Sequence, residues 1–316
     1  MRKIVGALAL SLISAFALSV PAVAAASPAL VGLSTAKVVI IVGPVGNTST
    51  QNSYIADASD AAAHAREWSA NVITIYSPHA TWANVEPALQ GASIVVYMGH
   101  GNGLTSPYHP TFDINNIPSG VDGLGLNPPG NTTNNGTTSY YGEATLAKYI
   151  KLAPNAVVIQ AHLCYSAGNS EPGNPLPTLA VAKQRADNFT AGWLRTGARA
   201  VISEVYSSGM AGWYIDQIFS SHQAIDAMWR SARTSPHNVQ AWPSARTAWS
   251  TTEIDPALKT GSDQYGRALG GDLTLTTDEV LASSSRSAFL RVTLSQSNPV
   301  GRSILGTTWV SSLRAQ

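Results

Sequence analysis

Five short apolar runs, separated by helix-like stretches, constrain the fold of this chain more than any other feature. Each run is rich in β-branched residues and has the length of a strand that is buried on both faces. The runs are Lys37 to Val42, Asn71 to Tyr76, Ser93 to Met98, Ala156 to Ala161 and Arg199 to Ser203. Stretches of helical character are residues 54–69, 82–90, 143–152, 179–194, 214–220 and 223–233. This alternation predicts an α/β fold with a mostly parallel central sheet, helices on both faces, and ligands at the carboxyl ends of the strands.

The first residues have the pattern of a secretory signal peptide. Arg2 and Lys3 precede an apolar run over residues 4–20, and small residues follow up to Ala26. The run approaches the ~18 residues that a membrane span needs, so a membrane anchor is the alternative. The Ala-x-Ala exit favours cleavage after residue 26. We therefore expect a secreted or extracytoplasmic mature chain without a membrane partner.

Two regions depart from the alternation of strands and helices. Residues 101–141 are dominated by Gly, Pro, Asn and Thr, which predicts a long loop that acts as a lid or an insert. Residues 234–316 have an irregular pattern with one expected strand over residues 288–294. The expected organisation is a main domain over residues 27–233, followed by a C-terminal extension or small subdomain.

Overall charge argues against a nucleic-acid partner. The chain has 19 Lys and Arg residues against 18 Asp and Glu residues, a formal net charge of +1. Binding to a phosphate backbone relies on a basic excess that this composition lacks. The 44% of hydrophobic residues is instead typical of a folded domain with a large core.

Two of the five apolar runs end in side chains that can do chemistry. His100 and Gly101 follow the third run, and Cys164, the only cysteine, follows the fourth. A thiol acts as a nucleophile in its thiolate form, and a neighbouring imidazole can accept its proton and later protonate a leaving amine. Gly101 allows close approach of the backbone, so its N–H and that of Cys164 could hold an oxyanion. The alternative for Cys164 is a small buried hydrophobic residue.

The segments VVYMGHGNG, around His100, and VVIQAHLCYSAG, around Cys164, resemble the caspase-like cysteine peptidases. This clan includes legumain, gingipain, clostripain, separase and the metacaspases. The resemblance extends over about residues 37–233, but only these two segments are specific. It implies a caspase-like three-layer sandwich and a secreted cysteine endopeptidase that acts through a thioester acyl-enzyme. It makes His100 the general base and acid, Cys164 the nucleophile, and Gly101 with Cys164 the oxyanion hole.

The same resemblance points to residues that would select the substrate. In relatives the P1 pocket is lined by the residue two before the cysteine and by two strand-end loops, which here are His162 and residues 44–50 and 204–209. Glu204 is the only acidic residue among them. We therefore expect a basic P1 side chain, Arg or Lys, ahead of Asn. In the alternative, Glu204 only caps a strand end on the surface.

Other functions receive less support from the sequence. His100, His162 and Cys164 could converge as a metal site, but zinc sites usually show further ligands at recognisable spacing, and none appears. No cofactor is expected, and a structural calcium ion stays open. The expected partner is a peptide or protein substrate, and nothing in the sequence indicates the oligomeric state. The runner-up function is an exported binding or adhesion module that keeps this fold without catalysis.

Overall fold

The structure is a computed structural model that describes residues 33–103, 112–130, 137–258 and 264–282. The expected signal peptide over residues 1–26 and the expected strand over residues 288–294 lie outside the described residues. Within the described part of the chain, no helix has both the length and the apolar character needed to cross a membrane.

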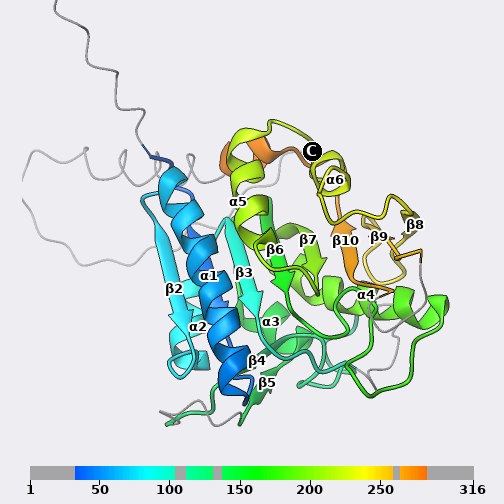
Figure 1. Cartoon of the computed structure of the whole chain (residues 1–316), viewed down its shortest axis with the longest axis horizontal. Helices are drawn as coiled ribbons and strands as arrows, with labels where there is room; N and C mark the ends of the chain where they lie inside the picture. Colours follow the sequence, from blue (N-terminus) through cyan, green and yellow to red (C-terminus); the bar gives the residue numbers. More distant parts are fainter. Residues whose placement is uncertain (1–32, 104–111, 131–136, 259–263, 283–316) are drawn as a thin grey trace, which may run out of the picture. The chain divides into compact units, whose positions relative to one another are not determined.

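An eight-stranded sheet forms the centre of the described chain, in the order β2-β1-β3-β6-β7-β10-β9-β8 (Figure 1). The first five strands of this order are parallel to one another. They are β1 (Val38–Val42), β2 (Val72–Tyr76), β3 (Ile94–Met98), β6 (Ala156–Ala161) and β7 (Ala198–Glu204). Each of them coincides with one of the five apolar runs, so the predicted strands and the mostly parallel α/β sheet are confirmed.

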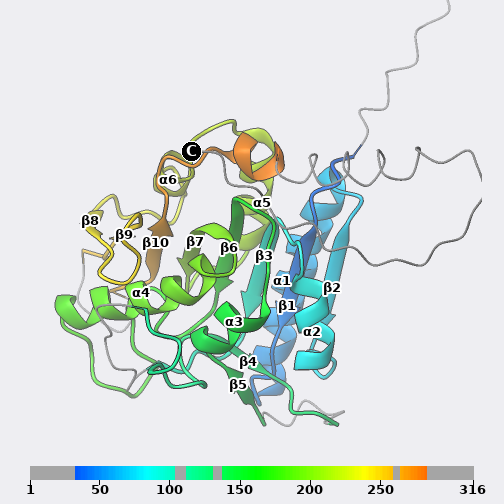
Figure 2. The same ribbon diagram turned by 180° about the vertical axis from the view of Figure 1, so that it is seen from behind.

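Helices cover both faces of this sheet, as the alternation predicts (Figures 1 and 2). They are α1 (Thr48–Trp68), α2 (Trp82–Leu89), α3 (Glu143–Tyr149), α4 (Leu179–Leu194), α5 (Met210–Ser220) and α6 (Ile225–Arg230). Helix α1 begins six residues before the expected position, at Thr48 instead of residue 54. The reason is a cap: the Asn47 side chain accepts hydrogen bonds from the N–H groups of Ser49 and Thr50.

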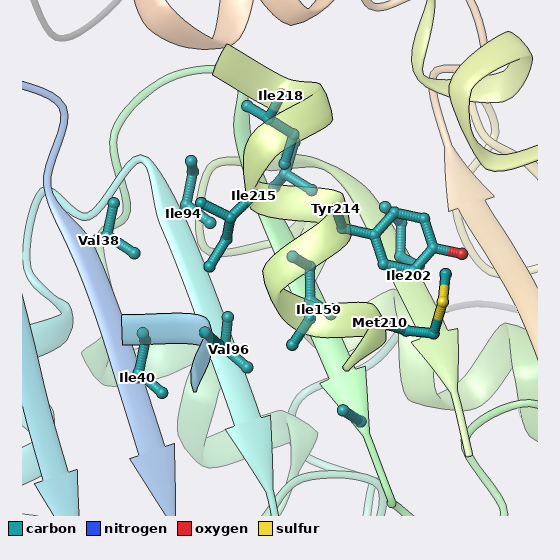
Figure 3. Close-up of a cluster of buried hydrophobic side chains, with 14 of the residues drawn as sticks. Val38, Ile40, Ile94, Val96, Ile159, Ile202, Met210, Tyr214, Ile215 and Ile218 are labelled. Carbon is teal, nitrogen blue, oxygen red and sulfur yellow. The ribbon is translucent and has the colours of Figure 1, made fainter. Parts of the chain in front are cut away.

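Alternate residues of each parallel strand point to opposite faces of the sheet and enter different cores. Val38 and Ile40 of β1 pack in the core beneath α1, α5 and α6, together with Ile94, Ile159, Ile202 and Tyr214 (Figure 3). Val39 and Ile41 pack on the other face with residues of α2, α3 and α4. Burial on both faces explains why these strands read as continuous apolar runs rather than as alternating ones.

Three strands from the region after residue 233 extend the sheet on one side. They are β8 (Gln240–Pro243), β9 (Thr251–Ile254) and β10 (Arg267–Gly271), and β10 pairs antiparallel with β7. The described residues of the expected C-terminal extension are therefore part of the same sheet. Their sequences carry no apolar run, which is why the sequence pattern did not predict them.

A small two-stranded sheet lies inside the predicted loop over residues 101–141. Strand β4 (Leu124–Leu126) pairs antiparallel with β5 (Ser139–Tyr141), and all residues of β4 are buried. Residues 104–111 and 131–136 of the same loop lie outside the described residues. The predicted loop therefore contains a short antiparallel strand pair, whose strand β4 is packed into the core.

The core beneath α5 generates a prediction about stability. Ile40 is 0% exposed, whereas Leu258 is 84% exposed. We expect Ile40→Ala to lower the free energy of unfolding by about 2–5 kcal/mol, because it leaves a cavity in a closed core. Leu258→Ala is the control and should stay within about 0.5 kcal/mol of the starting protein. Guanidinium unfolding of the purified proteins measures both, and equal effects would contradict this description of the core.

Candidate active site

The His100 and Cys164 segments meet at the carboxyl edge of the sheet. Strands β3 and β6 are neighbours, with Met98 opposite Ala161, and each segment continues from the end of its strand. The Gly101 backbone packs directly on Cys164: a β-carbon at position 101 would lie 2.0 Å from the Cys164 carbonyl oxygen. Only glycine permits this approach. The structure therefore brings the two predicted segments into contact.

The Tyr97 side chain holds the start of the His100 segment against the β4 hairpin. Its hydroxyl accepts a hydrogen bond from the Gly125 N–H at 2.8 Å and donates to the Gly125 carbonyl at 2.9 Å. The His100 carbonyl lies 3.2 Å from the same hydroxyl. Burial raises the pKa of Tyr97 far above its ordinary value, so the hydroxyl keeps its proton and these contacts persist.

Cys164 lies in a tight turn between two residues with left-handed backbone conformation. His162 has a φ of 57° and Tyr165 a φ of 70°. Residues other than glycine rarely adopt such positive φ values. Strand β6 ends at Ala161, so His162 and Cys164 do not occupy one face of a strand, as the metal-site alternative assumes. Arg185 of α4 holds the turn by donating to the carbonyls of Gly168 at 3.4 Å and Asn169 at 2.7 Å. Backbone strain of this kind is typical of functional turns.

The Cys164 thiol is only partly exposed, and its surroundings disfavour the thiolate. Burial raises the pKa of Cys164 to about 11, and the Glu171 carboxylate adds to this rise. Glu171 accepts a hydrogen bond from the Tyr165 hydroxyl at 3.2 Å, so it stays beside the turn that carries the thiol. At neutral pH the resting side chain is a thiol, and a reaction at the sulfur would need a base to remove its proton.

His162 does not point freely into solvent but pairs with an acidic residue of α1. Its Nε2 lies 2.8 Å from Asp57 Oδ2, and its ring stacks on Tyr54 with 4.6 Å between ring centroids. The other Asp57 oxygen accepts a hydrogen bond from the Gly209 N–H at 2.6 Å. His162 thus lies in a wall built from α1, the end of β6 and the start of α5.

Glu204 is buried in a network of its own at the end of β7. It is 1% exposed, so the alternative of a surface cap is wrong. Its Oε2 accepts hydrogen bonds from Arg267 Nε at 3.1 Å, the Tyr214 hydroxyl at 3.1 Å and Thr234 Oγ1 at 3.2 Å. Burial raises the pKa of Glu204, and Arg267 and the hydrogen bonds oppose this rise.

The sequence analysis missed Asp57 and Glu171 as residues of this site. Asp57 lies in an alanine-rich helix and Glu171 in a polar loop, and neither position carries a recognisable motif. Among the residues that the structure describes, no three His, Cys, Asp or Glu side chains come together as metal ligands.

Comparisons with known proteins leave the family of this chain open. No protein-family model matches it, and no curated protein matches its sequence. A flavodoxin from Streptococcus pneumonia TIGR4 aligns with a TM-score of 0.27 and 13% identity, over 58% of this chain and 94% of the flavodoxin. A secreted C11 cysteine protease from Bacteroides thetaiotaomicron, solved with an irreversible peptide inhibitor, aligns with a TM-score of 0.29 and 11% identity, over 70% of this chain and 66% of the protease. At such TM-scores, neither likeness assigns a function to the chain.

The raised pKa of Cys164 predicts a steep pH dependence of its alkylation. Because the thiolate is scarce well below pH 11, the rate with iodoacetamide should rise about tenfold per pH unit up to about pH 11. In guanidinium the pKa returns to about 8.5, so the unfolded chain should react faster at about pH 8. Cys164 is the only cysteine, which makes the labelling unambiguous. A native rate that levels off below about pH 8 would contradict this assignment.

Glu171 supplies a second, independent test of the same electrostatics. Glu171→Gln removes the negative charge that opposes the thiolate, so the pKa of Cys164 should fall and alkylation at a fixed pH should accelerate. Glu67→Gln, an exposed carboxylate on α1, is the matched control and should leave the rate unchanged. Identical alkylation profiles for the two variants would show that Glu171 does not act on Cys164.

Proposed function

We propose that this protein is an exported cysteine endopeptidase in which Cys164 is the nucleophile and His100 the general base and acid. The observation that carries the proposal is the packing of the Gly101 backbone on Cys164, because it brings the imidazole-bearing and thiol-bearing segments into contact at one sheet edge. In α/β sheets this is the edge at which ligands bind.

The chemistry follows from the protonated resting thiol. As Cys164 Sγ attacks the carbonyl carbon of the scissile bond, the thiol proton passes to His100, and the carbonyl oxygen becomes an oxyanion. His100 then protonates the leaving amine, the C–N bond breaks and a thioester remains. Water, deprotonated by His100, cleaves the thioester, releases the carboxylic acid and restores the thiol.

Two backbone donors are suited to stabilise the oxyanion. In the described part of the chain, neither the Gly101 N–H nor the Cys164 N–H donates to a backbone carbonyl. An oxyanion hole needs backbone N–H donors beside the nucleophile. This supports the role that the resemblance implies for Gly101 and Cys164.

The charges around Cys164 support a basic P1 side chain. The Glu171 carboxylate acts on the thiol, and Asp57 lies behind His162. The nearby guanidinium of Arg185 already donates to the carbonyls of Gly168 and Asn169, which follow the cysteine turn. A site of this kind favours Arg or Lys over an acidic side chain, with His162 as a wall of the P1 pocket.

One observation favours a second candidate function. Burial raises the pKa of Cys164, whereas nucleophilic cysteines usually have a lowered pKa. An exported binding or adhesion module that keeps the fold without catalysis would need no activated thiol. The experiment below separates the two functions.

The proposal predicts that Cys164→Ala and His100→Ala both abolish hydrolysis of a fluorogenic peptide library that the starting protein cleaves after Arg or Lys. We expect at least a ~10²-fold loss for the His100 variant, because proton transfer by a positioned base contributes that much. His222→Ala is the matched control: His222 pairs with Asp278 in an exposed position and should not affect the rate. Absence of hydrolysis in the starting protein, together with reversible peptide binding, would favour the binding module.

A further inference from the structure

A cavity of about 260 Å³ opens at the same sheet edge as Cys164, beyond the ends of β7 and β10. Its walls include Glu204, Arg267 and Tyr206. Strand β10 begins at Arg267, directly opposite Glu204. The Tyr206 hydroxyl accepts a hydrogen bond at 3.2 Å from the side chain of Asn169, which follows the cysteine turn. The cavity and the Cys164 turn are therefore neighbours on one rim.

The charged groups behind the cavity wall are already paired with one another. Arg267 lies between two carboxylates, with Nε 3.1 Å from Glu204 and Nη1 2.6 Å from Asp255. Its Nη2 donates to the Trp229 carbonyl at 2.6 Å. Two carboxyl groups, those of Glu204 and Asp255, therefore face one guanidinium at this wall.

Two hydroxyl groups of the same wall donate hydrogen bonds to these carboxylates. Thr234 Oγ1 donates to Glu204, and Ser235 Oγ donates to Asp255 while accepting from the His237 N–H at 3.1 Å, which leaves Ser235 one lone pair. A hydroxyl has one proton and two lone pairs, so a hydroxyl that already donates can only accept from a ligand. The wall therefore combines hydroxyl acceptors with two carboxyl groups behind them, which suits an ammonium or guanidinium group.

We propose that this cavity binds a Lys or Arg side chain of the peptide substrate, two or three residues away from the scissile bond. The inference rests on the proposed peptidase function. Cys164 follows β6, and the cavity lies beyond β7 and β10, so at about 4.8 Å per strand they are roughly 7 to 10 Å apart. An extended peptide covers that distance in two or three residues of ~3.3 Å each. Glu204 then acts in this second subsite instead of the P1 pocket.

The size of the cavity supports a single side chain as its occupant. Sites for whole cofactors and drug-sized ligands measure about 300–1,000 Å³, and this cavity is smaller. A Lys or Arg side chain in the cavity would donate hydrogen bonds from its N–H groups to the hydroxyl oxygens of Thr234 and Ser235. An acidic side chain would instead lie beside the carboxyl groups of Glu204 and Asp255.

Binding is tested first without catalysis, in the Cys164→Ala protein. Nα-acetyl-lysine methylamide should bind in isothermal titration calorimetry, and the norleucine analogue, which lacks the ammonium group, should not. Adding Thr234→Val should weaken lysine-amide binding about tenfold, because one hydrogen bond to a charged group is lost. Thr234→Ser, which keeps the hydroxyl, should retain it. Equal binding of the lysine and norleucine amides would overturn the proposal.

Substrate preference is tested in the active protein, with P1 held constant and Lys or norleucine placed at each of the next three positions. We expect kcat/KM to favour Lys about tenfold or more at one position, and Thr234→Val to remove that preference. Thr274→Val is the matched control, since the Thr274 hydroxyl also donates to a carboxylate, that of Asp272, but at the other end of β10. It should leave the preference unchanged.

The two measurements separate the two proposals. In one outcome, the starting protein and the Thr234→Val variant both hydrolyse peptides but show no preference for Lys at any position. This result overturns the cavity assignment and leaves the peptidase proposal intact. Thr234-dependent lysine-amide binding without hydrolysis of any peptide overturns the peptidase and leaves a cation-binding cavity.

Discussion

Parallel pairing of β3 with β6 places the candidate site residues. With Met98 opposite Ala161, the chain leaves both strands at one edge, and the Gly101 backbone packs on Cys164. The pairing depends on a sheet that is buried on both faces, by α1, α5 and α6 on one side and α2, α3 and α4 on the other. A shift of one residue would turn each strand's side chains to the opposite core, so the register is strongly determined.

Burial of this edge has opposing effects on the chemistry. The packing that holds the Cys164 turn also desolvates the thiol and raises its pKa to about 11. The Cys164 side chain of the resting protein is therefore a thiol, and in the proposed mechanism proton transfer has to accompany attack by the sulfur. For the proposed peptidase, exclusion of water would strengthen the interactions that favour the transition state, since charges interact more strongly at low dielectric.

Arg267 has a comparable organising role at the other end of the same edge. Arg267 pairs with both Glu204 of β7 and Asp255, which follows β9. Its guanidinium also lies over the Trp229 ring and donates to the Trp229 carbonyl, and these contacts connect α6 to the sheet. A buried pair of this kind adds little net stability, because desolvation costs about as much as pairing returns. Its effect is positional, since Arg267 holds the two carboxylates that accept hydrogen bonds from the hydroxyl groups of Thr234 and Ser235.

The sequence by itself determined the five parallel strands, most of the helices, and the placement of His100 and Cys164 at one sheet edge. These features depend on local runs of apolar residues and on what directly follows them. The tertiary structure decided what joins segments far apart in the chain. Asp57 reaches His162 across 105 positions and Arg267 reaches Glu204 across 63. Strands β8 to β10 are likewise defined by pairing with β7, not by apolar runs. Such contacts leave no periodic signal, because each depends on how separate elements pack.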